Sequence, residues 1–151
     1  MKSLFKSAAI FVALAAGSVS AAPKLAIVID DLGYAKWPID RAVSLPAHVS
    51  LAVFPGLPLS RKAAEKAHAN GHEVIVHLPM QPRGGQKLNP GTLTTSMSET
   101  AFLTQMMAHL QSVPYAVGAS NHMGSALTAD RGAMTLTMST LKSWGNLYFV
   151  D

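Results

Sequence analysis

Residues 25–33 of this 151-residue chain read Leu25-Ala26-Ile27-Val28-Ile29-Asp30-Asp31-Leu32-Gly33, an apolar run that ends in two adjacent carboxylates. Two later apolar runs lead to histidines: residues 74–80 contain His77, and residues 117–124 contain His122. The carboxyl ends of neighbouring buried strands meet at one edge of a parallel sheet, where α/β folds place their chemistry. The pattern therefore predicts one metal site built from carboxylate and imidazole side chains.

The rest of the chain alternates short apolar runs, rich in β-branched residues, with segments of helical spacing. This alternation is typical of an α/β fold with a parallel sheet, in which each crossover contains a helix. We expect strands over residues 24–29, 49–53, 73–77, 116–118 and 147–150. We expect helices over residues 38–44, 60–70, 98–112 and 128–143.

Local signals indicate where these helices begin and end. Ser60 and Thr128 are residue types that favour the N-cap, Ser96 with Glu99 forms a capping box, and Asn70-Gly71 is a C-terminal stop. The spacing of apolar residues also predicts the faces that the second and third helices bury. These faces consist of Ala63, Ala64, Ala67, Phe102, Leu103, Met106, Met107 and Leu110.

The first 22 residues have the composition of a signal peptide. Lys2 and Lys6 give a basic start, residues 8–16 are apolar, and residues 19–22 offer the small side chains that a signal peptidase needs. The apolar run is too short for a membrane anchor, which takes about 20 apolar residues. We therefore expect a periplasmic or secreted protein, with a signal peptide over residues 1–22 and one domain over residues 23–151.

Charge and cysteine content exclude several classes of protein. The formal charge of +4 falls to +2 once Lys2 and Lys6 leave with the signal peptide, and the remaining basic residues form no run. A nucleic-acid partner is therefore not expected, because such a partner requires a basic stripe. The chain has no cysteine, so disulfides and cysteine-based zinc fingers are impossible.

The longest stretch without strand or helix signals runs from Pro79 to Ser96 and directly follows His77. Loops of this length are usually functional or disordered. The sequence leaves two interpretations open, a lid or wall that faces a substrate and a flexible surface excursion.

Residues 147–151 predict a buried strand that leads to another carboxylate, Asp151. A strand at this position lacks its covering helix, so part of its apolar surface would be exposed. We therefore expect the chain to be truncated at its C-terminal side, with the domain over residues 23–151 incomplete.

Several strings occur in order along the chain: IDDLGY at 29–34, HLPM at 77–80, GTLTT at 91–95, NHMGS at 121–125, TADR at 128–131 and FVD at 149–151. Together they resemble the divergent polysaccharide deacetylases, exported bacterial proteins related to the NodB-like carbohydrate esterases. The resemblance covers residues 25–151. It implies a distorted (β/α) barrel of the NodB-like glycoside hydrolase/deacetylase type, with a divalent metal at the carboxyl-end rim of the strands.

The resemblance also implies roles for individual residues. Asp31 matches the metal-binding aspartate, Asp30 matches the neighbouring catalytic base, and His77 and His122 are the expected imidazole ligands. NodB-like enzymes carry both histidines in one His-Ser/Thr-x-x-His motif, whereas this chain has Gln81 at the second position. The second imidazole must therefore come from the next strand, through His122.

The implied activity is metal-dependent removal of N-acetyl groups from a cell-envelope polysaccharide, and Asn121 and Asp151 are candidate substrate contacts. Asp with two His suits zinc, and cobalt, nickel or manganese would fit the same ligands. An alternative function is a non-catalytic envelope protein that keeps the fold and binds a glycan or a protein. No stable membrane span is expected after signal cleavage, and the oligomeric state is left open.

Each assignment also has a structural alternative. A carboxylate after a strand can cap a helix or bind loop amides, and a histidine at a strand end can be an ordinary hydrogen-bonded residue. Trp37 is expected to be a packed aromatic rather than a sugar-stacking platform, and Trp144 a core residue. The histidines expected on helix surfaces or near turns, with no metal role, are His48, His68, His72 and His109.

Overall fold

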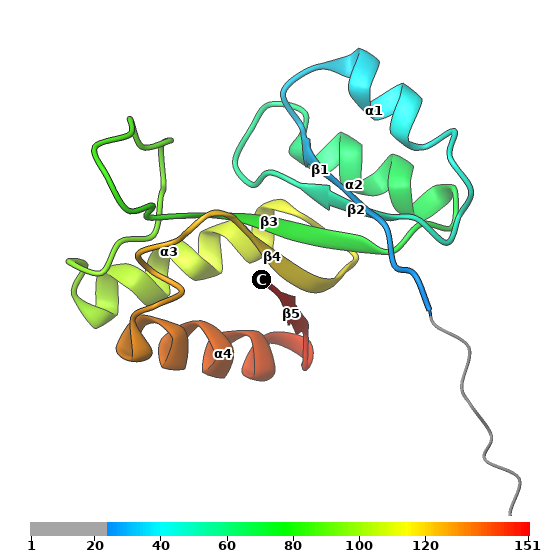
Figure 1. The fold of residues 1–151 in the computed structure, drawn as a ribbon. Helices are drawn as coiled ribbons and strands as arrows, with labels where there is room; N and C mark the ends of the chain where they lie inside the picture. Colours follow the sequence, from blue (N-terminus) through cyan, green and yellow to red (C-terminus); the bar gives the residue numbers. More distant parts are fainter. Residues whose placement is uncertain (1–23) are drawn as a thin grey trace, which may run out of the picture.

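A computed structural model describes residues 24–151, and the predicted signal peptide over residues 1–22 lies outside the described residues (Figure 1). Strands and helices alternate along the chain. The strands are β1 (Val28–Leu32), β2 (Ser50–Val53), β3 (Val74–Met80), β4 (Ala116–Met123) and β5 (Tyr148–Val150). The helices are α1 (Lys36–Ala42), α2 (Ser60–Ala69), α3 (Glu99–Ser112) and α4 (Arg131–Gly145).

The strands are all parallel and follow the order β1-β2-β3-β4-β5. Right-handed crossovers that always step in one direction place the helices on one face of the sheet. Figure 1 shows α1 and α2 beside β1 and β2, and α3 and α4 beside the later strands. The predicted α/β class is confirmed, with the strand order of a barrel wall. Within residues 24–151 the sheet is open, because β1 and β5 form its two edges.

Three strands run further toward their carboxyl ends than the sequence predicted. β1 includes Asp30 and Asp31, β3 continues through His77 to Met80, and β4 continues to Met123. Polar residues at the rim still take part in the ladder, in which His77 pairs with Ser120 and Pro79 with His122. The candidate site residues therefore lie on strands. Pairing with one or two neighbouring strands fixes the positions of their backbones.

The centre of the core is β3, in which all seven residues are buried. Helices cover one face of this strand, and residues such as Leu93 and Leu127 lie in the same core cluster. In α2 the predicted alanine face is buried, and in α3 Phe102, Met106 and Leu110 are buried as expected. Met107 is instead 39% exposed, because the sheet-facing stripe of α3 is narrower than predicted.

The helix ends correct several predictions. Ser98, not Ser96, caps α3 and accepts a hydrogen bond from the Ala101 amide, and Asp130 rather than Thr128 caps α4. Ser60 lies inside α2, where its hydroxyl donates to the Phe54 carbonyl at 2.6 Å. This bond ties the end of β2 to α2. The C-terminal stop of α2 is confirmed, because the helix ends at Ala69 and Asn70 is its C-cap.

The two tryptophans are more exposed than predicted. Trp37 is 72% exposed, because α1 turns Ile39 and Ala42 toward the sheet and residues two positions apart on a helix face different sides. Trp144 lies in the last turn of α4 and is 39% exposed. Neither tryptophan is therefore a core residue.

Among the described residues, no helix combines the length and hydropathy that a membrane crossing requires.

Candidate metal site

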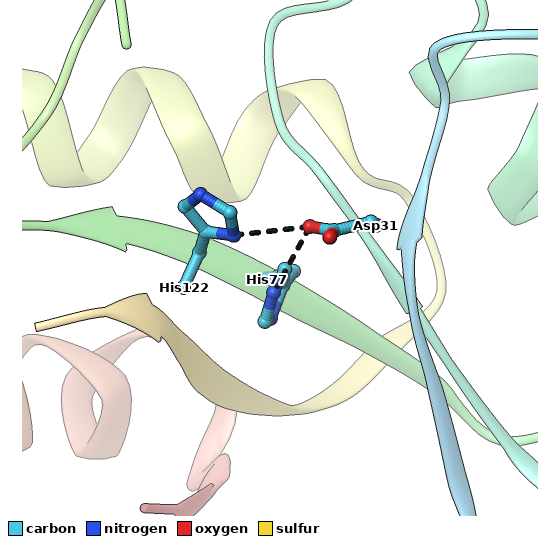
Figure 2. A group of neighbouring side chains, drawn as sticks. All are labelled: Asp31, His77 and His122. Atoms are coloured by element: carbon cyan, nitrogen blue, oxygen red, sulfur yellow. Dashed lines mark ion pairs between the residues drawn. The ribbon is translucent and has the colours of Figure 1, made fainter. Parts of the chain in front are cut away.

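The structure brings Asp31, His77 and His122 together at the carboxyl-end rim of the sheet (Figure 2). The three side chains come from β1, β3 and β4 respectively. His77 pairs with Ser120 in the parallel register, and His122 lies two residues beyond Ser120. Alternate strand residues share a face, so both imidazoles project to the same side of the sheet.

A backbone irregularity in β1 allows two neighbouring carboxylates to approach one histidine. Successive strand residues normally point to opposite faces. The register of β1 against β2 shifts between Ile29 and Leu32, and Asp31 has a left-handed φ of 57°. As a result, Asp31 Oδ1 lies 3.3 Å from His77 Nε2, and Asp30 Oδ2 lies 3.9 Å from the same nitrogen. The backbone therefore turns within Asp31 itself as well as at Gly33, whose φ is 123°.

The donor atoms have the spacing of ligands around one cation. His122 Nδ1 lies 3.0 Å from Asp31 Oδ1, and one donor atom from each of the three residues lies within 4.8 Å of the others. Ligands at ~2.0–2.2 Å from a tetrahedral zinc lie roughly 3.3–3.6 Å from one another. One carboxylate with two imidazoles is also a donor set that zinc and neighbouring transition metals accept. The residues present therefore fit a divalent metal.

Burial controls the charge of His77, which is 4% exposed. Removal from water lowers the pKa of His77, and the nearby Asp31 and Asp30 carboxylates oppose that shift. Asp31 itself is more accessible, with a side chain that is 53% exposed. The site thus combines a buried imidazole with a carboxylate that solvent can reach.

A second hydrogen-bond partner orients each imidazole. The Ser120 hydroxyl lies 2.9 Å from His77 Nδ1, and Ser120 is itself buried. The Asn89 amide nitrogen lies 3.2 Å from His122 Nε2. Phe54 packs edge-on against His122, with 5.1 Å between ring centroids. None of these three residues was among the predicted site residues. Only Ser120 left a signal, because it lies on the same face of the strand as His122.

The two candidate substrate contacts are not part of this cluster. The Asn121 amide donates to the Met123 carbonyl at 2.8 Å and so closes the turn at the end of β4. Asp151 is exposed and follows β5, the edge strand whose Val150 pairs with Ser120. The roles predicted for both residues toward a substrate stay predictions.

The remaining histidines lie outside the cluster. Two of them are buried rather than on surfaces: His72 bonds the Val49 carbonyl at 2.8 Å, and His109 bonds the Gly91 carbonyl at 2.8 Å. His68 stacks on Tyr115 with 4.1 Å between ring centroids. His72 follows the turn at Asn70-Gly71, as expected, whereas the burial of His109 corrects its expected place on a helix surface. Each of the two finds a backbone carbonyl partner inside the fold.

Gln81 occupies the position at which NodB-like enzymes place their second histidine. Its side-chain oxygen accepts hydrogen bonds from the amide and the hydroxyl of Thr95, and its carbonyl accepts from the amides of Ala126 and Leu127. This residue therefore joins the start and the end of the long loop after β3. A further pair of bonds, Leu93 to Pro79 and Gln81 to Leu93, holds the loop along the end of that strand.

Two curated proteins are similar to this chain in sequence. The chain is 44% identical over 138 residues to the uncharacterized protein YibQ of Escherichia coli (strain K12), which covers 91% of the chain and 43% of that protein. It is 37% identical over 128 residues to an uncharacterized protein of Haemophilus influenzae, covering 85% of the chain and 45% of the relative. The chain thus spans less than half the length of these curated relatives.

A solved structure shows the same fold. The crystal structure of an uncharacterized protein from Agrobacterium tumefaciens C58 superposes with a TM-score of 0.73 at 23% sequence identity. The match covers 82% of this chain and 51% of that one. The sequence profile of the divergent polysaccharide deacetylases matches residues 27–151, so the chain belongs to the divergent polysaccharide deacetylase family.

Proposed function

We propose that this chain forms the metal-binding part of an exported hydrolase that removes N-acetyl groups from a cell-envelope polysaccharide. The observation that supports this most is the convergence of Asp31, His77 and His122 beside a second carboxylate, Asp30, in a member of this family. Three protein ligands with an open coordination position, and a nearby carboxylate that can accept a proton, are groups that metal-assisted amide hydrolysis uses.

Asp31, His77 and His122 would hold the metal, with zinc as the first candidate. When bound, the cation supplies Lewis-acid chemistry: it makes water acidic and polarises the acetyl carbonyl. Ser120 keeps Nε2 of His77 directed at the site by bonding the other ring nitrogen. The burial of His77 lowers its pKa and so keeps the lone pair of that nitrogen available.

Asp30 is the proposed general base. Its carboxylate lies at the edge of the site, 3.9 Å from His77 Nε2, with a side chain that is 66% exposed. A carboxylate in this position can accept a proton from water that enters from solvent and is held against Asp31 and the two imidazoles. Asp31 and Asp30 thus have different tasks, since one faces both imidazoles and the other only His77.

The experiment measures metal content and acetate release together. We expect the purified chain to bind about one zinc per molecule and to release acetate from N-acetylglucosamine oligomers. Asp30→Asn should keep the metal and lose activity, whereas Asp31→Asn should lose both. If the unmodified chain holds zinc but releases no acetate, the hydrolase proposal is wrong for this chain.

A second candidate function is a non-catalytic envelope protein that binds a glycan or a protein. The observation that favours it is Gln81, which replaces a motif histidine and serves to anchor the loop after β3. Metal content without turnover, combined with retention on an N-acetylated glycan, would support this function. Export, which both candidates require, is tested by fractionation of cells that express the chain with and without residues 1–22.

A further inference from the structure

A cavity of about 370 Å³ lies beside the metal site, at the same rim of the sheet. Four segments enclose it: Tyr34 after β1, residues 54–57 after β2, residues 89–91 of the long loop, and one side of α3. Ligand sites in α/β proteins occur at this rim and typically have volumes of roughly 300–1,000 Å³.

The cavity and the metal site share a wall. Phe54 lines the cavity, and its ring centroid lies 5.1 Å from that of His122 and 6.4 Å from that of His77. Asn89 also lines the cavity, and its amide contacts His122 Nε2. Tyr34 packs against Phe54 with 5.3 Å between ring centroids. A molecule in the cavity would therefore lie next to His122, one of the three candidate ligands.

Hydrogen bonds between elements fix the shape of the cavity. The Gly56 amide donates to the Ser112 hydroxyl of α3 at 3.1 Å, and His109 of α3 bonds the Gly91 carbonyl at 2.8 Å. A side chain at Gly91 would approach Gln105 Nε2 to 2.9 Å, so the loop touches α3 closely there. The long loop is thus a wall of the cavity, which is one of the two interpretations that the sequence left open.

The lining is uncharged. Among the described residues, no Asp, Glu, Lys or Arg lines the cavity. The polar side-chain groups that line it are the Tyr34 hydroxyl, the Asn89 and Gln105 amides and the His109 imidazole. Burial lowers the pKa of His109, and burial with the nearby Asp31 raises the pKa of Tyr34, so both groups are neutral near pH 7. By contrast, a hollow of about 820 Å³ along α4 contains Arg131 and Lys142.

We propose that this cavity is the subsite that binds one uncharged N-acetylated sugar ring of the substrate next to the metal site. The assignment rests on the proposed function. Sugar rings combine an apolar face with hydroxyl groups, and the cavity offers the Phe54 and Tyr34 rings together with the Asn89 and Gln105 amides. A charged ligand would find no opposite charge among the described lining residues.

The test fills the cavity from α3. Ala108 lines the cavity and is exposed, so Ala108→Trp adds bulk there without disturbing the core. Ala101→Trp is the matched control, because Ala101 is an exposed alanine of the same helix that does not line the cavity. The probe is the N-acetylglucosamine tetramer, titrated calorimetrically into the zinc-loaded Asp30→Asn chain, in which turnover is blocked.

We expect Ala108→Trp to weaken tetramer binding about tenfold or more, since it occupies space that the ring requires, and Ala101→Trp to leave it unchanged. Tyr34→Ala, which removes a ring contributed by the segment after β1, should weaken binding as well. The glucosamine tetramer, which carries an ammonium group on each ring, should bind more weakly than its acetylated counterpart. Zinc affinity, measured separately, should be the same in Ala108→Trp and the control.

Unchanged tetramer binding in both Ala108→Trp and Tyr34→Ala overturns the subsite, and so does the absence of any tetramer binding. These results are separable from a failure of the proposed hydrolase. If tetramer binding depends on Ala108 but the unmodified chain releases no acetate, the subsite proposal stands and the hydrolase proposal is wrong. If the chain releases acetate and its KM is the same in Ala108→Trp, the hydrolase proposal stands and the subsite proposal is wrong.

Discussion

Ser120 is the residue on which the geometry of the buried imidazole depends. Its hydroxyl is the only side-chain partner of His77 Nδ1 among the described residues, at 2.9 Å, and both residues are buried. A metal-ligating histidine almost always donates its other ring N–H to a partner that fixes the orientation of the ring, and loss of such a partner typically reduces metal affinity 10–100-fold.

We therefore expect Ser120→Ala to weaken zinc binding by about tenfold or more, because Nδ1 of His77 is left without a partner in a buried position. Ser120→Thr keeps the hydroxyl and should keep most of the affinity. Competition with a chromophoric zinc chelator measures both. Equal affinities for the alanine variant and the unmodified chain would show that Ser120 does not orient His77.

At this scale the sequence predicted the convergence of the three candidate ligands, but not the residues that hydrogen-bond to them. Asp31, His77 and His122 follow apolar runs, and the parallel arrangement alone brings such residues to one rim. Ser120 contacts His77 only through the exact pairing register of two strands, and Asn89 reaches His122 only through the path of a long loop. Local sequence patterns identify each strand separately, and they give neither the residue pairing between β3 and β4 nor the path of the loop.

At the scale of elements, the loop between β3 and α3 matters most for the surroundings of the candidate site. Its ends are joined by Gln81 and Thr95, and its middle is held against α3 by the bond between His109 and Gly91. The sequence showed a long segment rich in glycine and proline but could not show that it is tied at several points. These ties depend on His109, a residue of a helix that the pattern placed on a surface.

Gly91→Ala tests how tightly this loop is packed. Gly91 has a φ of 76°, and an added Cβ would lie 2.9 Å from Gln105 Nε2 and 3.0 Å from His109 Cε1. We expect a loss of about 2–4 kcal/mol in the free energy of unfolding, from the left-handed backbone and the overpacking together. Urea denaturation followed by circular dichroism measures it.

Gly84→Ala is the control for the backbone cost alone. Gly84 lies in the same loop with a φ of 94°, but its added Cβ would meet only the end of the flexible Gln86 side chain. This variant should lose about 1–2 kcal/mol. If the two variants lose the same amount, then the loop is not packed closely against α3 at Gly91.

At the scale of the whole molecule, the candidate metal site connects parts of the sheet that are far apart in sequence. Asp31 comes from the edge strand β1, whereas His77 and His122 come from the middle of the sheet. The α/β class and the order of elements could be predicted from alternating patterns, because each strand pairs with the next one along the chain. The exposure of Trp37 could not, since it depends on which side of a short helix meets the sheet.

Zinc should therefore stabilise the fold as a whole. A ligand that binds only the folded state adds about 2.7 kcal/mol at a free concentration of 100 times its Kd. We expect the thermal midpoint to rise on addition of zinc and to fall back when a chelator is added, as followed by differential scanning fluorimetry.

Asp31→Asn is the matched variant for this experiment. Asparagine tolerates the left-handed φ of 57° at this position and keeps the size of the side chain, so the fold without metal should be little changed. The zinc-dependent rise should be largely lost in this variant. A rise of the same size in both proteins would place the zinc at some other group of residues.

The contact between Asn89 and His122 has a consequence for the loop. In the arrangement described, the amide NH₂ of Asn89 faces Nε2, which requires the tautomer with its hydrogen on Nδ1, toward Asp31. If Nδ1 coordinates a cation, that hydrogen must move to Nε2, and the carboxamide of Asn89 must rotate by half a turn to present its oxygen. Cation binding at the rim would then change the contact between His122 and Asn89, and so affect the loop that borders the neighbouring cavity.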